Sequence, residues 1–290
     1  MAVQQKTQPP RRRSAARRRR RRRQRICRGL FLASFLIVAA SVLVVLPKIG
    51  VLPAGAEAPA SQDAPAIPAA SNLPIIAIDP GHGGVDPGSE GSGVWEYQMT
   101  WQTANDLADL LTQDGRFAPI LTLSESESQD SSVPRVEPAE RAARANDAGA
   151  VLLFSIHGNA DASSTTDGFE CYPVTPGHSN HEDSLQLAQL VAAEIQNAGA
   201  SLRGENGVRY IYFGSGDDRL VFESSDESTH SDPSFGILEA ADCPAILVEQ
   251  CFLTSPSDAA SFASQEGCQR AAQAYYNAIC AWWESTMAGE

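Results

Sequence analysis

The stretch IIAIDPGHGG, from Ile75 to Gly84, decides the fold because it carries an apolar run straight into a histidine flanked by glycines. The chain repeats this arrangement in VLLFSIHGNA at 151–160 and in AILVE at 245–249. Uninterrupted apolar runs of this kind are typical of strands buried on both faces, as in a mainly parallel sheet between helices. Such sheets place their functional groups just beyond the carboxyl ends of the strands. The sequence therefore predicts that His82, His157 and Glu249 gather at one edge of a sheet.

The segments between these runs supply helices and further strands. Apolar residues recur at helical spacing in three stretches, 104–111, 187–195 and 268–282. Pro138 is placed to open one more helix, which ends near Ala148. Short apolar runs predict additional strands at 120–123, 169–173 and 208–213, the last two antiparallel or at an edge. Strand and helix alternate, which indicates an α/β fold: a single globular domain with a mainly parallel or mixed sheet of about six strands flanked by helices.

Charge divides the 290-residue chain into two unlike parts. Fourteen of its 22 basic residues lie within the first fifty positions, which contain no acid and carry a formal charge of +14. All 35 acidic residues and only eight arginines follow, so the remainder carries −27. A body this acidic would repel phosphates, which excludes nucleic acid as its partner. The whole chain has 43% apolar residues, and its remainder of 240 residues is long enough to bury a substantial core.

The basic N-terminal part predicts a membrane anchor. Residues 29–47 are nineteen consecutive uncharged, mostly apolar positions, which as a helix rise about 28 Å, close to the thickness of a bilayer core. Arginines crowd the preceding side, so residues 1–28 are expected to form a basic cytoplasmic tail and 29–47 a transmembrane signal-anchor helix. A Pro/Ala-rich linker over 48–73 and a folded domain over 74–286 would then lie outside the cell membrane. The alternative is secretion after cleavage of a signal peptide near 54–56.

Cysteines and the remaining histidines indicate no second metal site. Five cysteines follow Cys27, and their spacing fits neither a zinc knuckle nor a Cys-x-x-Cys redox pair. They are expected to be small buried hydrophobes or to form one structural disulfide. His178, His181 and His230 lie in polar stretches and are expected to be solvated.

A metal site is instead expected around His82 and His157. Glycines beside each histidine let the backbone turn and present the imidazole at the end of its strand. Two imidazoles are too few, because a catalytic zinc usually takes three protein ligands and leaves its fourth position to water. Glu96, at the head of the first helix, is the best-placed third ligand.

At this point the sequence resembles the zinc-dependent N-acetylmuramoyl-L-alanine amidases, which cleave bacterial peptidoglycan. The likeness runs over about 74–284, in IAIDPGHGGVDPGSEG, the Glu of VWEYQMTW, ERAARANDAGAVLLFSIHGNA, GFECY and PAILVEQCFLTSPSD. Carried over by position, it implies that His82, Glu96 and His157 bind Zn²⁺ and that Glu249 is the catalytic carboxylate. Arg141 and Asn146 also match family positions, where we expect them to hold a helix against the sheet.

The resemblance implies hydrolysis of the amide between N-acetylmuramic acid and L-alanine, with peptidoglycan as substrate and the membrane as anchor. Two alternatives remain: a catalytically silent peptidoglycan-binding or activator protein, and a zinc hydrolase of another wall amide. Cys251 stands where many relatives have glycine. Only residues 161–168 separate the second histidine segment from the next strand, which leaves no room for the inhibitory insertion of division-type members. The need for an activator protein cannot be deduced from the sequence.

Overall fold

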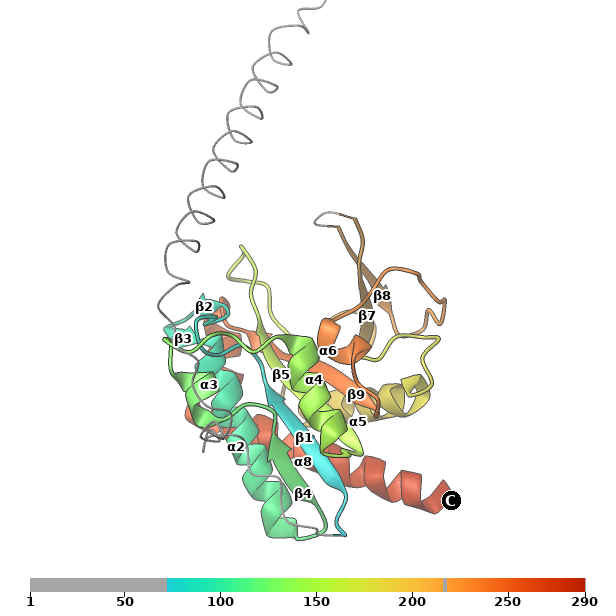
Figure 1. Ribbon diagram of the computed structural model, residues 1–290. Helices are drawn as coiled ribbons and strands as arrows, with labels where there is room; N and C mark the ends of the chain where they lie inside the picture. Colours follow the sequence, from blue (N-terminus) through green and yellow to red (C-terminus); the bar gives the residue numbers. More distant parts are fainter. Residues whose placement is uncertain (1–71, 216–217, 290) are drawn as a thin grey trace, which may run out of the picture. The chain divides into compact units, whose positions relative to one another are not determined.

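The computed structural model describes residues 72–215 and 218–289 (Figure 1). The expected cytoplasmic tail, the expected transmembrane helix and nearly all of the expected linker fall on residues 1–71 and so lie outside the described part. Among the residues that are described, no helix is both long enough and apolar enough to cross a bilayer.

A five-stranded sheet forms the centre, in the order β4-β1-β5-β9-β6. Four strands are parallel: β1 (Ile75–Pro80), β4 (Ala118–Leu121), β5 (Leu152–Asn159) and β9 (Ala245–Phe252). The edge strand β6 (Glu170–Pro173) runs antiparallel to β9. The three apolar runs of the sequence are β1, β5 and β9, side by side, so the prediction of an α/β fold with a mostly parallel sheet is confirmed.

The sixth strand that the sequence predicts is not part of this sheet. Strand β7 (Arg209–Phe213) pairs with β8 (Arg219–Glu223) as a separate antiparallel hairpin. Its link to the central sheet is one isolated bridge between Val208 and Cys171. The central sheet therefore has five strands, and β7 belongs to the hairpin. A second small pair, β2 (Glu90–Gly91) and β3 (Val94–Trp95), precedes the first long helix.

Four long helices lie where the sequence predicts them: α2 (Glu96–Asp114), α4 (Pro138–Asp147), α5 (His181–Asn197) and α8 (Gln265–Gly289). Three short helices complete the described part: α3 (Glu125–Gln129), α6 (Gly236–Glu239) and α7 (Pro256–Phe262). Helix α2 ends at Gly115, whose positive φ of 75° closes the last turn in the left-handed conformation that glycine tolerates.

Helices cover both faces of the sheet, as the uninterrupted apolar strands require. In β1, Ile76 and Ile78 point into the core beneath α2, α5 and α8, whereas Ala77 points into a second core beneath α4 and α6. In β5, Leu152 points into the first core and Leu153 into the second, because successive strand residues face opposite sides. The odd-numbered residues in the first halves of β5 and β9 face this second core. The side chains of His157 and Glu249 therefore point to the α4 side of the sheet, at the carboxyl ends of β5 and β9.

The five cysteines of residues 72–289 are free thiols: Cys171, Cys243, Cys251, Cys268 and Cys280. Cys171, Cys251 and Cys268 are buried in the larger core. The expected alternative of a structural disulfide among them is therefore wrong, and these three pack as small hydrophobes.

Candidate active site

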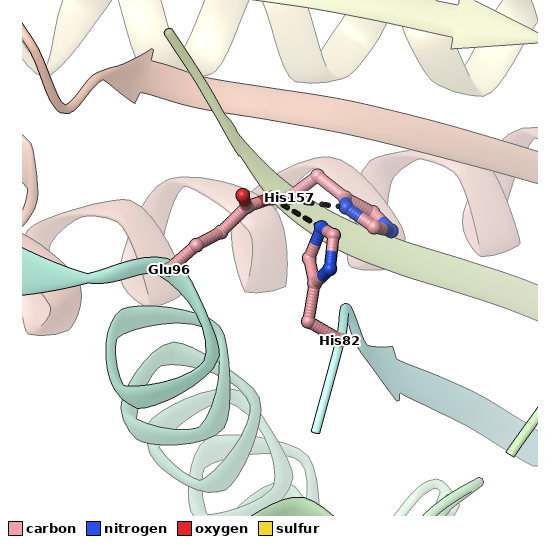
Figure 2. Close-up of side chains that lie close together, drawn as sticks. All are labelled: His82, Glu96 and His157. Carbon is pink, nitrogen blue, oxygen red and sulfur yellow. Dashed lines mark hydrogen bonds and ion pairs between the residues drawn. The ribbon is translucent and has the colours of Figure 1, made fainter. Parts of the chain in front are cut away.

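His82, Glu96 and His157 come together from three separate elements (Figure 2). His82 follows β1, Glu96 is the first residue of α2, and His157 lies in β5. Glu96 Oε1 is 3.0 Å from His82 Nε2 and 3.1 Å from His157 Nδ1. The three donor atoms all lie within 4.8 Å of one another. Strands β1 and β5 and helix α2 thus bring two imidazoles and one carboxylate close together.

Two glycines, which have no side chain, allow this close approach. A Cβ on Gly81 would lie 2.5 Å from the His157 ring, and one on Gly88 would lie 2.7 Å from a Glu96 carboxylate oxygen. Only glycine fits at either position. His82 itself has φ of 66°, which is uncommon outside glycine and is a form of strain found at functional sites.

A set of hydrogen bonds orients the three side chains. His82 Nδ1 is 3.0 Å from Asp86 Oδ2, so Nε2 is the nitrogen turned toward Glu96. Glu96 accepts backbone hydrogen bonds from Gly158 at Oε1 and from Ser89 at Oε2. Partners of this kind orient metal-binding histidines and carboxylates in general. Asp86 was missed from the sequence, although an acid four residues after a glycine-flanked histidine was the available signal.

The electrostatics differ among the three residues. Burial lowers the pKa of His82, but the carboxylates of Glu96 and Asp86 outweigh it and raise that pKa. Burial raises the pKa of Glu96, but hydrogen bonds from the two imidazoles outweigh it and hold that pKa far below its usual range. Burial lowers the pKa of His157, which favours the neutral form that binds metal. Ligand atoms 2.0–2.1 Å from a tetrahedral zinc lie roughly 3.3 Å apart. The two distances from Glu96 Oε1 to the imidazole nitrogens, 3.0 and 3.1 Å, are close to this value. The residues therefore fit a metal ion with the two-histidine, one-glutamate donor set of many catalytic zinc sites.

Glu249 lies beside this group. Strand register pairs it with His157 of β5 on one side and with Glu170 of β6 on the other. Its Oε2 atom is buried and has no hydrogen-bond partner among the described residues. Burial, followed by the charges of Glu96 and Glu170, raises the pKa of Glu249 well above its usual value. A carboxylate in this setting is suited to holding and passing a proton.

Glu170 is a buried neighbour that the sequence did not single out. It accepts hydrogen bonds from Asn159 at 2.7 Å and from Arg209 at 2.5 Å. Its strand was predicted at 169–173 as antiparallel or at an edge, but nothing local shows that β6 pairs with β9. Only the antiparallel register brings Glu170 next to Glu249.

A pocket of about 600 Å³ opens over these groups. His82, Glu96, His157 and Glu249 line it together with an apolar wall and three arginines. The wall comprises Tyr172, Ile211, Phe213, Phe235, Ile237 and Leu247, and the arginines are Arg135, Arg141 and Arg219. The site is thus a concave, partly apolar cavity with polar groups gathered in it, as ligand sites usually are.

The other candidate residues have structural contacts. Arg141 donates to Asp79 at 3.1 Å and to the Pro80 carbonyl at 3.0 Å, and Asn146 donates to the Ala240 carbonyl. Arg141 therefore holds α4 against β1 of the sheet, as expected, whereas Asn146 ties α4 to the end of α6. Among the remaining histidines, only His178 is exposed.

Two expectations of solvated histidines are wrong. His181 is buried at the start of α5, 2.7 Å from the Val174 carbonyl through Nδ1. His230 packs against the rings of Tyr212 and Phe222. Within residues 72–215 and 218–289, only His82, Glu96 and His157 form a group that could hold a metal.

The model of the N-acetylmuramoyl-L-alanine amidase family matches residues 76–281. The chain belongs to this family. The Haemophilus influenzae protein named Probable N-acetylmuramoyl-L-alanine amidase AmiB is 27% identical over 71% of this chain and 51% of its own length. The amidase LytC of Bacillus subtilis is 28% identical over 72% of this chain and 35% of its own length. The chain thus spans about half or less of these two curated relatives.

A solved structure agrees with the family assignment. The N-acetylmuramoyl-L-alanine amidase of Clostridium difficile 630 matches with a TM-score of 0.57 and 26% identity. The match covers 74% of this chain and 99% of that one. The likeness therefore extends over the amidase fold as a whole.

Proposed function

We propose that this chain hydrolyses the amide bond between N-acetylmuramic acid and L-alanine in peptidoglycan, with zinc held by His82, Glu96 and His157. The observation that carries the proposal is the convergence of these donors beside the unpartnered carboxylate of Glu249, in a chain of the amidase family. A binding protein without catalysis has no need of this combination. An intact donor set therefore favours an enzyme over a silent activator protein.

Each residue has a distinct part in the chemistry. Bound zinc supplies Lewis acidity, which polarises the scissile carbonyl and lowers the pKa of a water molecule to about 7. Glu249 Oε2 accepts the proton of the attacking water and delivers it to the leaving amine of the alanine. The raised pKa of Glu249 suits it to retain that proton between the two transfers. Asp86 keeps His82 in the tautomer that presents Nε2.

Digestion of purified peptidoglycan, followed by mass spectrometry of the fragments, tests the proposal. Stem peptides with a free amino-terminal alanine and glycan strands without peptide are expected. Cut cross-links with peptides still attached to glycan would instead favour a hydrolase of another wall amide. Intact wall in the presence of zinc would favour the silent binding protein.

We also infer that residues 29–47 anchor the chain in the cell membrane, with 1–28 in the cytoplasm and the domain 74–286 outside, joined by the linker 48–73. The support is the nineteen-residue apolar run and the arginines on one side of it. Protease added outside spheroplasts should degrade the domain while it is still attached to the membrane. Recovery of the domain in the medium, shortened near 54–56, would favour signal cleavage.

A further inference from the structure

One face of the β7–β8 hairpin forms part of the pocket wall. Phe213 pairs directly with Arg219, and Ile211 pairs with Val221. Directly opposed residues of an antiparallel pair share a face, so Phe213 and Arg219 project to the same side. Ile211, Phe213 and Arg219 all line the pocket that contains the metal-binding group. The Arg219 guanidinium carbon lies 5.9 Å from the centre of the Phe213 ring.

Arg219 differs from the other two arginines of the pocket. Arg135 is 3.0 Å from Asp86, and Arg141 forms a buried ion pair with Asp79. Arg219 is exposed and forms no ion pair with any residue of 72–215 or 218–289. In a region with 35 acids and eight arginines, the pocket thus retains one cation without an acidic partner in the described part.

Arg219 lines the same pocket as Glu249 and the group of His82, Glu96 and His157. The guanidinium plane, supported by the Phe213 ring, leaves N–H groups at its edge for a ligand. Such a fork matches the geometry of a carboxylate, to which arginine donates two parallel hydrogen bonds.

We propose that Arg219 binds a free carboxylate of the stem peptide, on the leaving-group side of the scissile amide. This inference rests on the proposed function. The carboxyl group of muramic acid is consumed in the amide itself, and the sugar otherwise presents neutral hydroxyl and acetamido groups. A carboxylate near the centre must therefore belong to the peptide. The residue after the first alanine, D-isoglutamate, carries one, and its amidation to D-isoglutamine removes the charge. Arg219 thus makes the enzyme selective for the free acid.

Two N-acetylmuramoyl tripeptides that differ only in D-isoglutamate or D-isoglutamine at the second position test this selectivity. Their dissociation constants are measured by calorimetry on the full chain carrying Glu249→Gln, so that turnover does not interfere. With Arg219 present, the free acid should bind about tenfold more tightly than the amide. Arg219→Gln should abolish this difference by weakening the free acid alone, and Arg219→Lys should keep part of it.

Arg270→Gln is the matched control. Arg270 also lies over an aromatic ring, 5.8 Å from the centre of Phe262, but it does not line the pocket. The Arg270→Gln substitution should leave the dissociation constants of both probes unchanged. Equal weakening of both probes by Arg219→Gln, or no effect on either, would overturn the proposal.

A separate assay distinguishes failure of this inference from failure of the proposed function. The chain with native Glu249 is incubated with both probes, and release of free alanyl peptide is followed. Cleavage without discrimination between the probes overturns the role of Arg219 and leaves the amidase activity standing. Discrimination in binding that depends on Arg219, without any cleavage, supports the carboxylate site and contradicts the hydrolytic function.

Discussion

Glu170 of β6 and Glu249 of β9 are direct partners in an antiparallel pair, so their carboxylates emerge side by side on the same face of the sheet. Opposed residues in such a pair have Cβ atoms about 4.5–5.5 Å apart. His157 is the partner of Glu249 on the other side. Glu249 therefore lies between the His157 imidazole and a second acid, and that second acid forms an ion pair with Arg209.

Replacing Glu170 with Gln should lower the pKa of Glu249. The charge of Glu170 is one of the causes that raise this pKa, after burial and the charge of Glu96. If Glu249 must be ionised to accept a proton, the acidic limb of the pH dependence of kcat/KM should move to lower pH. Titrating kcat/KM from pH 4 to pH 9 for the original chain and the variant measures the shift.

Glu223→Gln is the control for that experiment. Glu223 is 3.1 Å from Arg209 Nε, so it contacts the same arginine without lying beside Glu249. In Glu223→Gln, the acidic limb of the pH dependence of kcat/KM should stay in place. An unshifted limb in Glu170→Gln, or an equal shift in both variants, would show that the charge of Glu170 does not act on Glu249.

Asp86→Asn should weaken zinc binding while leaving the fold intact. The carboxylate of Asp86 holds His82 through Nδ1, and removing partners of this kind typically costs 10- to 100-fold in metal affinity. Titration with a competing chelator gives the dissociation constant, and His82→Ala provides the limit of full loss. Zinc affinity equal to that of the original chain would contradict the orienting role of Asp86.

Arg141→Met should strongly destabilise the domain. It leaves Asp79, which is fully buried, without its ion pair, although Ser155 still donates to it. Removing one partner of a buried pair typically costs about 3–5 kcal/mol. Urea unfolding measures the loss, with the exposed Arg270→Met as a control that should change the free energy of unfolding by less than about 0.5 kcal/mol. A loss below about 1 kcal/mol in Arg141→Met would contradict this account of how α4 is held.

Glu127 should contribute to stability only above acidic pH. Arg144 makes two hydrogen bonds to its carboxylate, which lower the pKa of Glu127 from 4.5 to about 2. Because the folded-state pKa is depressed, the stabilisation is complete above about 4.5 and disappears as pH falls toward 2. Glu127→Gln should therefore lower the free energy of unfolding by about 0.5–1 kcal/mol at pH 7 and by progressively less below pH 4.5.

Urea titrations of both chains at several pH values between 7 and 3 check this trend. Glu140→Gln is the matched control, because Glu140 also contacts Arg144 but is 61% exposed. It should have little effect at any of these pH values. A destabilisation by Glu127→Gln that stays constant down to pH 3 would contradict the ion-pair origin of the effect.

The parts of the site that follow strand ends were predictable from the sequence. His82, His157 and Glu249 each come after or within an apolar run, and parallel strands bring such positions to one edge whatever the loops do. Glu96 followed from its place at the head of a helix.

The parts that depend on pairing between distant segments were not predictable. Glu170 acquires its position from the antiparallel register of β6 with β9, and Arg219 acquires its position from the hairpin that takes β7 out of the sheet. His181 stands in a polar stretch, yet the backbone carbonyl of Val174 compensates its burial. No local pattern records these contacts, because each joins residues whose proximity is set by tertiary packing.

The rate at which a zinc-loaded Glu249→Gln chain releases peptides with free amino-terminal alanine from purified peptidoglycan tests the central claim most directly. The substitution removes the proton acceptor but leaves His82, Glu96 and His157 in place, so the variant should hold as much zinc as the original chain. Its rate should fall at least about a hundredfold, because general acid–base groups contribute about 10²–10⁴. A rate equal to that of the original chain, at equal zinc content, would contradict the assignment of Glu249 and the mechanism built on it.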